Sequence, residues 1–266
     1  MATILVPVVA ARRSLLIPSL HGGSLRIELF EFAFRRVKLH LMFHAYFDYL
    51  IWISPALLLA FWAQMRVKSA FAGAAQVPVR MTGAQAAQQM LSEAGIQNVG
   101  IEQVGGKLSD HYDTRHKVLR LSNQVYSGRS AAAVGIACHE AGHAIQDARH
   151  YVPLVVRNAA VPAAGFGSSA SLILLVIGSI MQFPALILLG IALFACVVFF
   201  QIVNLPVEFN ASSRAKTELM AMGICGQQEM VHVNKVLNAA ALTYVAATLQ
   251  AVLTLLFYIS RFSNQR

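Results

Sequence analysis

Four apolar stretches, each long enough to cross a lipid bilayer, constrain this chain more than any other feature. A bilayer core of about 30 Å needs about 20 apolar residues in a helix, and only a helix satisfies its own backbone hydrogen bonds within lipid. The stretches are residues 43–65, two that adjoin over 163–203, and 239–259. Since 57% of the residues are hydrophobic, against about 45–50% in ordinary globular domains, we predict a mainly α membrane protein with about four transmembrane helices.

The second and third stretches are separated only by a short Gln-Phe-Pro sequence, which predicts a tight transmembrane hairpin. The polar regions on either side of it, 66–162 and 204–238, then lie on the same side of the membrane, because the chain crosses twice between them. The tail, 260–266, lies on the other side. Residues far apart in sequence can therefore build one site at one membrane face.

Residues 1–41 form an uncertain N-terminal extension. They lack the basic segment that precedes the apolar core of a secretory signal, and residues 24–41 are basic and amphipathic enough to lie on a membrane surface. A mis-assigned start is an alternative, because Met42 would begin the chain directly at the first apolar stretch.

The net charge of +9 does not indicate a nucleic-acid partner. The basic residues are scattered beside the apolar stretches, where they are typical of membrane-flanking positions. The three cysteines, Cys138, Cys196 and Cys225, have no paired spacing, so no disulfide framework is expected.

Local patterns predict a small α+β region within 66–162. Thr82 and Gln85 form a capping box for a helix that ends at Gly95. Residues 99–122 have the turn signals of short strands, and Ser130 caps a helix over 131–148. The charged and histidine-rich second half of that helix argues against a fifth membrane span.

That helix carries a histidine, glutamate and histidine in the pattern HExxH. His139 and His143 are four residues apart, so both can present imidazole nitrogens to one Zn²⁺, with Glu140 beside them as general base. Chance would give the pattern in about one chain per hundred at this composition. The small residue Gly142 would admit another segment closely, and we expect the strand at 117–122 to be an edge along which a substrate can lie extended.

A catalytic zinc needs a third protein ligand. His150 lies about 10 Å further along the helix axis than His143 at 1.5 Å per residue, and Gln146 and Arg149 interrupt the extended pattern HExxHxxGxxH. No aspartate follows Asp147.

Glu208 is the best third-ligand candidate, because it follows the third apolar stretch on the side of the HExxH helix. We expect Pro206 to bend or begin a helix that presents Glu208 from its first turn. Glu218 is expected to be an exposed helix charge, and His111 and His232 to be structural or exposed.

Four stretches in this order, "LLLAFWAQMRVKSAF", "LSDHYDTRHKVLRLS", "YSGRSAAAVGIACHEAGHAIQDA" and "IVNLPVEFNASSRA", resemble the YugP-like family of bacterial integral-membrane neutral zinc metallopeptidases. The resemblance covers roughly residues 42–262. It implies a zincin-like peptidase of gluzincin type, with His139, His143 and Glu208 as ligands of one zinc ion and Glu140 as general base.

The sequence departs from related gluzincins in one respect. Their third ligand often belongs to an ExxxD pattern, whose aspartate steadies a ligating histidine, and Ser212 occupies that position here. Asn210, Ser212 or a backbone carbonyl could supply that hydrogen bond, and the sequence does not choose among them.

The leading functional prediction is a membrane-embedded zinc metalloendopeptidase acting on peptides or membrane-protein segments. The alternative is a catalytically silent zinc-binding membrane scaffold, which a fourth protein ligand such as Cys138 or His111 would favour. A metal transporter is disfavoured because the last three apolar stretches contain no histidine, aspartate or glutamate. The sequence does not predict the oligomeric state.

The protein is predicted to be a multi-pass protein of the cell's cytoplasmic membrane. With a start at Met42, the basic residues flanking the site side place the site on the cytoplasmic face by the positive-inside rule. Basic residues within 1–41, if that segment is genuine, oppose this orientation. The flanking residues of the site side are Arg66, Lys68, Arg149, Arg157, Arg214, Lys216 and Lys235.

Overall fold

The structure is a computed structural model that describes residues 23–106 and 109–263, with side chains described from Tyr46 onward apart from that gap. It divides into two compact units, Met1–Asp48 and Tyr49–Arg266. The whole of the predicted extension therefore lies in the first unit, and residues 1–22 of it lie outside the described residues. The second unit contains the site.

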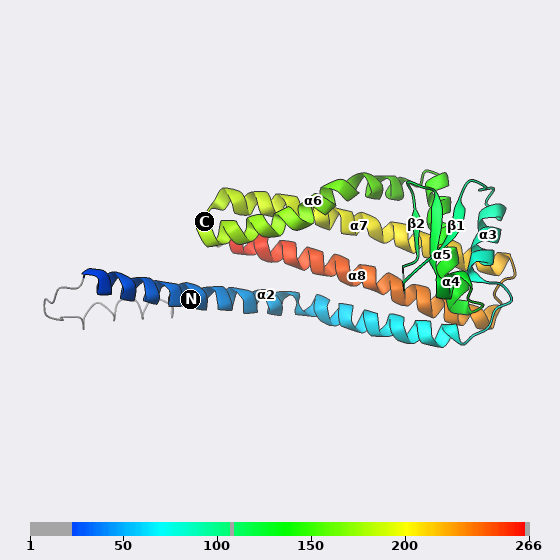
Figure 1. Cartoon of the computed structure of the whole chain (residues 1–266), viewed down its shortest axis with the longest axis horizontal. Coiled ribbons are helices and arrows are strands. Elements are labelled where there is room, and N and C mark those ends of the chain that lie inside the picture. Colours follow the sequence, from blue (N-terminus) through cyan, green and yellow to red (C-terminus); the bar gives the residue numbers. More distant parts are fainter. Residues whose placement is uncertain (1–22, 107–108, 264–266) are drawn as a thin grey trace. The chain divides into compact units, whose positions relative to one another are not determined.

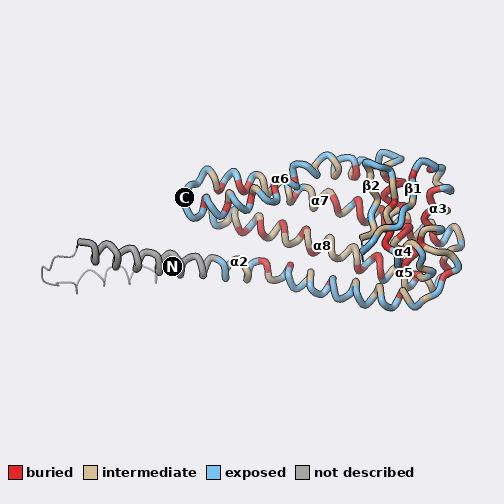
Figure 2. Tube along the Cα trace, in the orientation of Figure 1, coloured by how far each residue is buried: buried red, intermediate tan, exposed pale blue. Residues whose placement is uncertain are grey.

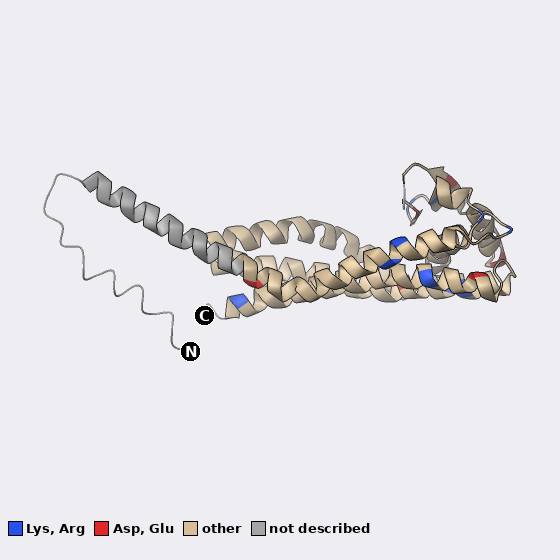
Figure 3. Cartoon of the chain, turned by 90° about the horizontal axis from the view of Figure 1, so that it is seen from below, with Lys and Arg blue, Asp and Glu red and all other residues tan. Residues whose placement is uncertain are grey.

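Among the described residues, four helices are long and apolar enough to cross a membrane: α2 (Gly23–Ala75) in its part Tyr46–Ala75, α6 (Val152–Met181), α7 (Pro184–Ala221) and α8 (Gln227–Ser263). Each contains one of the predicted apolar stretches, so the mainly α membrane architecture is confirmed (Figure 1). No charged residue lies within the predicted apolar stretches 163–203 and 239–259. Figure 3 shows a long part of the helix bundle without coloured positions.

The predicted hairpin is formed by α6 and α7, which pack along each other (Figure 1). Gln182 makes the turn in a left-handed conformation, with φ of 56°. Helix α8 packs on α7, where the Thr248 hydroxyl donates to the Gln201 carbonyl at 3.3 Å and the Lys216 ammonium donates to Asn238 Oδ1 at 2.7 Å.

The part of α2 within the second unit lies beside α8. The Tyr49 and Thr254 hydroxyls are 3.3 Å apart, and the Tyr49 and Phe257 rings meet edge to face at 5.2 Å. Ala56, Ala63 and Ala74 are fully buried on α2, whereas many of its large apolar side chains are exposed. Exposed apolar surface of this extent suits a lipid-facing helix.

The region between α2 and α6 folds as a small α+β layer. It contains α3 (Gly83–Glu93), β1 (Gly100–Val104), β2 (His111–Asp113), β3 (Val118–Ser122), α4 (Asn123–Tyr126) and α5 (Ala131–Ala148). The predicted capping box is present, since the Thr82 hydroxyl accepts from the Gln85 N–H and the Gln85 side chain accepts from the Thr82 N–H. Ser130 caps α5, as predicted.

The sheet order is β1-β3-β2, with β3 parallel to β1 and antiparallel to β2. The expectation that the strand at 117–122 is an edge strand is therefore wrong. Leu119 and Leu121 of β3 are completely buried, and burial of both favours a central position with pairing on both sides. The edge strand that contacts α5 is β2.

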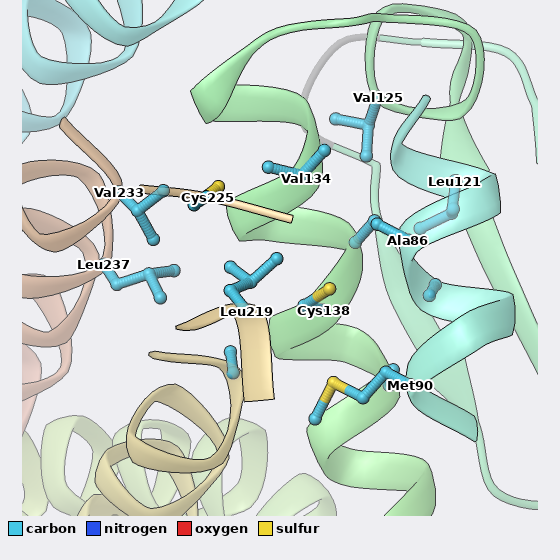
Figure 4. Packing of buried hydrophobic residues seen from close by; sticks show 14 of the residues in the cluster. Ala86, Met90, Leu121, Val125, Val134, Cys138, Leu219, Cys225, Val233 and Leu237 are labelled. Carbon is cyan, nitrogen blue, oxygen red and sulfur yellow. The ribbon is translucent and has the colours of Figure 1, made fainter. Parts of the chain in front are cut away.

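A hydrophobic core joins this layer to the ends of α7 and α8. Met90 of α3, Leu121 of β3, Val134 of α5, Leu219 of α7 and Val233 of α8 all belong to it (Figure 4). Figure 2 shows buried residues concentrated where α3, α5 and the sheet meet the long helices. The core thus fixes α5 against the membrane helices.

Helix α7 continues through Pro206 without a break, so the expectation that a helix begins there is wrong. Proline costs a helix one backbone hydrogen bond, and apolar helices tolerate this loss when neighbouring helices hold them in place. Pro206 is exposed on α7, while its neighbours Val207 and Glu208 are buried on the opposite side. Glu208 therefore projects from the middle of a packed helix.

Candidate metal centre

The centre forms where α5 crosses α7 at close range. A Cβ added to Gly142 would lie 2.8 Å from the carbonyl oxygen of Ala211, closer than real Cβ atoms approach. Only glycine lets the two backbones pack at this distance. The contact confirms that Gly142 admits another segment, and it places His139 and His143 opposite the buried face of α7.

His139, His143 and Glu208 converge at this crossing. Glu208 Oε2 lies 3.2 Å from His139 Nε2 and 3.6 Å from His143 Nε2. One ligand atom from each of the three residues falls within 4.8 Å of the others. The structure thus brings together the three residues named as ligands from the sequence.

The other ring nitrogen of each histidine is held by a polar side chain. His139 Nδ1 lies 3.1 Å from Ser212 Oγ, and His143 Nδ1 lies 3.0 Å from Gln146 Oε1. The Gln146 amide donates in turn to the Val207 carbonyl at 2.8 Å and to Asn210 Oδ1 at 3.0 Å. In this arrangement each Nε2 faces Glu208, and a cation bound there would take the place of the proton that the rings share with the carboxylate.

Gln146 is the residue that the sequence analysis missed. It appeared only as a mismatch to an extended zincin pattern, although its spacing of three from His143 places it on the same helix face. Ser212 and Asn210, the two side chains considered from the sequence as hydrogen-bond partners, both belong to this network. Ser212 bonds His139 directly, and Asn210 accepts from Gln146.

The donor set suits a zinc ion. Two imidazole nitrogens and one carboxylate oxygen match a common catalytic zinc set, and their orientation by hydrogen bonds is typical of zinc-ligating histidines. Burial opposes charge on His143, but hydrogen bonding to Glu208 and the charges of Glu140 and Glu208 raise its pKa overall. The pocket therefore attracts positive charge, which a divalent cation would supply in place of the proton.

Glu140 is held beside this group by strand β2. The Tyr112 backbone N–H donates to Glu140 Oε2 at 3.1 Å, and the Tyr112 hydroxyl donates to Asp147 Oδ2 at 2.8 Å. Lys117 forms an ion pair with the same Asp147 carboxylate. Burial and the Asp147 bond raise the pKa of Tyr112 well above its usual value, so it stays a protonated donor at any physiological pH. These hydrogen bonds hold β2 against α5 at Glu140 and at Asp147, two helical turns further along.

A cation and a phenol from two other helices lie near the carboxylates. Arg157 of α6 interacts electrostatically with Glu140, Glu208 and Tyr244, and Tyr244 of α8 interacts with Glu208 through its hydroxyl. Among the described residues, Arg157 Nε is buried with no hydrogen-bond partner. An N–H group without a partner beside a metal site is available to a substrate oxygen.

The remaining candidates lie elsewhere. His111 Nδ1 is 2.8 Å from the Ser109 carbonyl, His150 is exposed after the end of α5, and His232 lines a separate cavity between α2 and α8. Cys138 belongs to the hydrophobic core, where burial raises the pKa of its thiol. Within the described part of the chain, no fourth histidine, cysteine or carboxylate joins the group of three.

Comparison with known proteins agrees with this geometry. Residues 49–263 match the model of a family described as "Putative neutral zinc metallopeptidase". The chain is 46% identical over 213 residues to the "Putative membrane protease YugP" of Bacillus subtilis (strain 168), covering 79% of this chain and 95% of that protein. No solved structure gives a significant match.

Proposed function

The chain belongs to this family of neutral zinc metallopeptidases, and from that premise we propose that it is a membrane-embedded metalloendopeptidase of gluzincin type that uses one zinc ion. The observation that carries the proposal is the convergence of His139, His143 and Glu208 from two helices, with Glu140 alongside. The ion would be held by the two Nε2 atoms and the Glu208 carboxylate.

When bound, zinc supplies Lewis acidity that lowers the pKa of a water ligand toward about 7 and polarises a peptide carbonyl. Glu140 accepts the proton of the attacking water and then passes it to the leaving amine nitrogen, so the C–N bond breaks without releasing an amide anion. The Tyr112 N–H orients the carboxylate for both transfers, because it holds one oxygen and leaves the other to accept.

Arg157 and Tyr244 are placed to stabilise the carbonyl oxygen of the substrate as negative charge develops on it. Donors that are already oriented in a site shielded from water contribute strongly to such stabilisation. The partnerless Nε of Arg157 supports this role, since a substrate oxygen would satisfy it.

The substrate class is a peptide or a membrane-protein segment in extended form. β2 is the edge strand nearest Glu140, so an extended segment adding to the sheet beside it would pass the metal centre. The site lies where α5 meets α7, and α7 continues into an apolar span, which suits cleavage close to the bilayer surface.

We infer that the site faces the cytoplasm, because the site side carries most of the membrane-flanking basic residues and the opposite tail carries few. The protein would then cut substrates at the inner surface of the cytoplasmic membrane.

A catalytically silent zinc scaffold is the competing function. It would be favoured by a fourth protein ligand closing the metal site, as in structural zinc sites. The three-residue group within the described residues supports the enzyme instead.

The test measures zinc content and peptide cleavage on the same purified samples of wild type, Glu140→Gln and Glu208→Ala. Glu140→Gln should keep its zinc and lose activity by about 10²–10⁴-fold, because it removes the base and leaves the ligands. Glu208→Ala should lose both. Glu218→Gln, on the same helix outside the group, is the matched control and should retain both. Full activity in Glu140→Gln would refute the role of Glu140 as general base. An unchanged zinc content in Glu208→Ala would refute the role of Glu208 as a zinc ligand.

A further inference from the structure

A small cavity lies between α2 and α8, away from the metal centre. It has a volume of about 250 Å³. Its lining residues come from both helices: Arg66, Ser69, Ala70, Gly73, His232 and Lys235.

The cavity is lined by cationic groups and contains no acid. Arg66 and Lys235 face it from different helices, and none of the described residues that line it is an aspartate or glutamate. Within the described part of the chain, neither cation forms an ion pair with a carboxylate, whereas Lys117 and Arg120 both do. The Arg66 guanidinium instead stacks over the Trp62 ring at 5.0 Å. Two cations without carboxylate partners, beside the Ser69 hydroxyl and the His232 ring, form a binding surface for an anion.

The cavity lies at the level where lipid headgroups are expected. Arg66 directly follows the first apolar stretch, and Lys235 precedes the fourth by four residues. Trp62, one turn before Arg66, is typical of the membrane–water interface. Leu58 and Phe61 are each 70% exposed, so α2 offers an uncovered apolar surface on the bilayer side of the cavity. Figure 3 shows basic positions at this end of the long helices and none along their middle.

We propose that this cavity binds the phosphate of an anionic phospholipid headgroup, with the acyl chains lying along the exposed apolar face of α2. Arg66 and Lys235 would neutralise the phosphate, and Ser69 would donate a hydrogen bond to it. A free phosphate ion offers the same headgroup chemistry but would leave the apolar face uncovered. Basic pockets between transmembrane helices at the cytoplasmic surface are suited to anionic lipids.

The location gives such a lipid a structural effect. His232 is followed by Val233, and a Cβ added to Gly135 of α5 would lie 3.3 Å from Val233 Cγ1. A lipid that bridges α2 and α8 therefore fastens α2 to the helix that packs on the HExxH helix. This role is independent of the proposed peptidase activity.

The experiment uses the full chain in lipid vesicles with Trp62 as the reporter. The sequence has two tryptophans, Trp52 and Trp62, so Trp52→Phe leaves one beside the cavity. Brominated phosphatidylglycerol should quench Trp62 at a lower mole fraction than brominated phosphatidylcholine. Lys235→Gln should reduce that preference about fivefold, the effect of about 1 kcal/mol per basic residue.

Lys68→Gln is the matched control, since Lys68 is an exposed lysine of α2 that does not line the cavity. It should leave the preference within twofold of the Trp52→Phe parent, and Lys235→Arg should restore it. An equal loss in Lys68→Gln and Lys235→Gln would overturn the proposal, because it would reveal diffuse surface attraction. Inorganic phosphate is then added at constant ionic strength. If it abolishes the preference for phosphatidylglycerol, the cavity binds free phosphate, and the lipid assignment is overturned. Neither result bears on the zinc and cleavage measurements, so the two proposals fail separately.

Discussion

The two histidines of the centre are steadied by different chemistry. Ser212 Oγ holds His139, and the Gln146 amide holds His143 while also bonding the α7 backbone at Val207. The sequence narrowed the support of the ligands to Asn210, Ser212 or a carbonyl, because spacing places residues on a face but does not fix the rotamer of a polar side chain. Gln146 could not be chosen from sequence, since two of its three partners, Val207 and Asn210, lie on α7, 61 and 64 residues later.

Ser212→Ala should weaken zinc binding about 10–100-fold, the usual effect of removing a group that orients a ligating histidine. The reason is that His139 loses the partner of its Nδ1 and becomes less fixed in orientation. Competition for zinc with a chelator of known affinity measures the change. Ser213→Ala is the control, because Ser213 is the exposed neighbour on α7. Equal affinities in the two variants would remove Ser212 from the site.

The crossing of α5 and α7 determines whether the ligands meet. At this crossing Gly142 lies against the Ala211 backbone. The close approach at Gly142 was predictable from its small size, but its partner, Ala211, was not. The helices, the capping box and the Ser130 cap were predictable because they depend on local patterns. The central position of β3 and the passage of α7 through Pro206 were not predictable, because both depend on packing with distant segments.

Gly142→Ala should destabilise the protein by about 1–3 kcal/mol, the usual cost of overpacking. Its Cβ would meet the Ala211 backbone, so the helices must separate, and zinc retention should fall along with the melting temperature. Gly165→Ala is the control, because it lies within α6 with nothing inside 4 Å of its added Cβ. Since alanine favours helix over glycine, the control should melt at the same or a higher temperature. Thermal unfolding in detergent compares the two, and equal melting temperatures would contradict the close crossing.

On the scale of the whole chain, counting membrane crossings predicted that two polar regions separated by a hairpin would share one face. The meeting of α5 with the end of α7 agrees with that count. Packing does not show which side of the membrane holds the metal centre, because the fold is the same in either orientation. The side depends on the charges that flank the spans.

Sidedness can be measured with a membrane-impermeant maleimide on intact cells. With Cys196 replaced by alanine, Gln97→Cys on the site side should label only after lysis, whereas Met181→Cys at the hairpin turn should label in intact cells. Both added positions are exposed. Cys138 and Cys225 should stay unlabelled, because burial raises the pKa of both thiols, that of Cys225 to about 11. The reverse labelling pattern would place the site outside the cell.

Helix α7 runs unbroken for 38 residues, from the hairpin turn through the lipid to the metal centre and beyond. At 1.5 Å per residue it is about 57 Å long, nearly twice the hydrocarbon thickness of about 30 Å. Helices adjust to bilayers of different thickness by tilting. A tilt of about 5° about a point roughly 14 residues before Glu208 would move that carboxylate by about 2 Å relative to the bilayer. Because the hydrophobic core packs α5 against α7, we expect both helices to tilt together. A change in membrane thickness would then alter the depth of the metal centre below the bilayer surface and leave its ligand spacing unchanged.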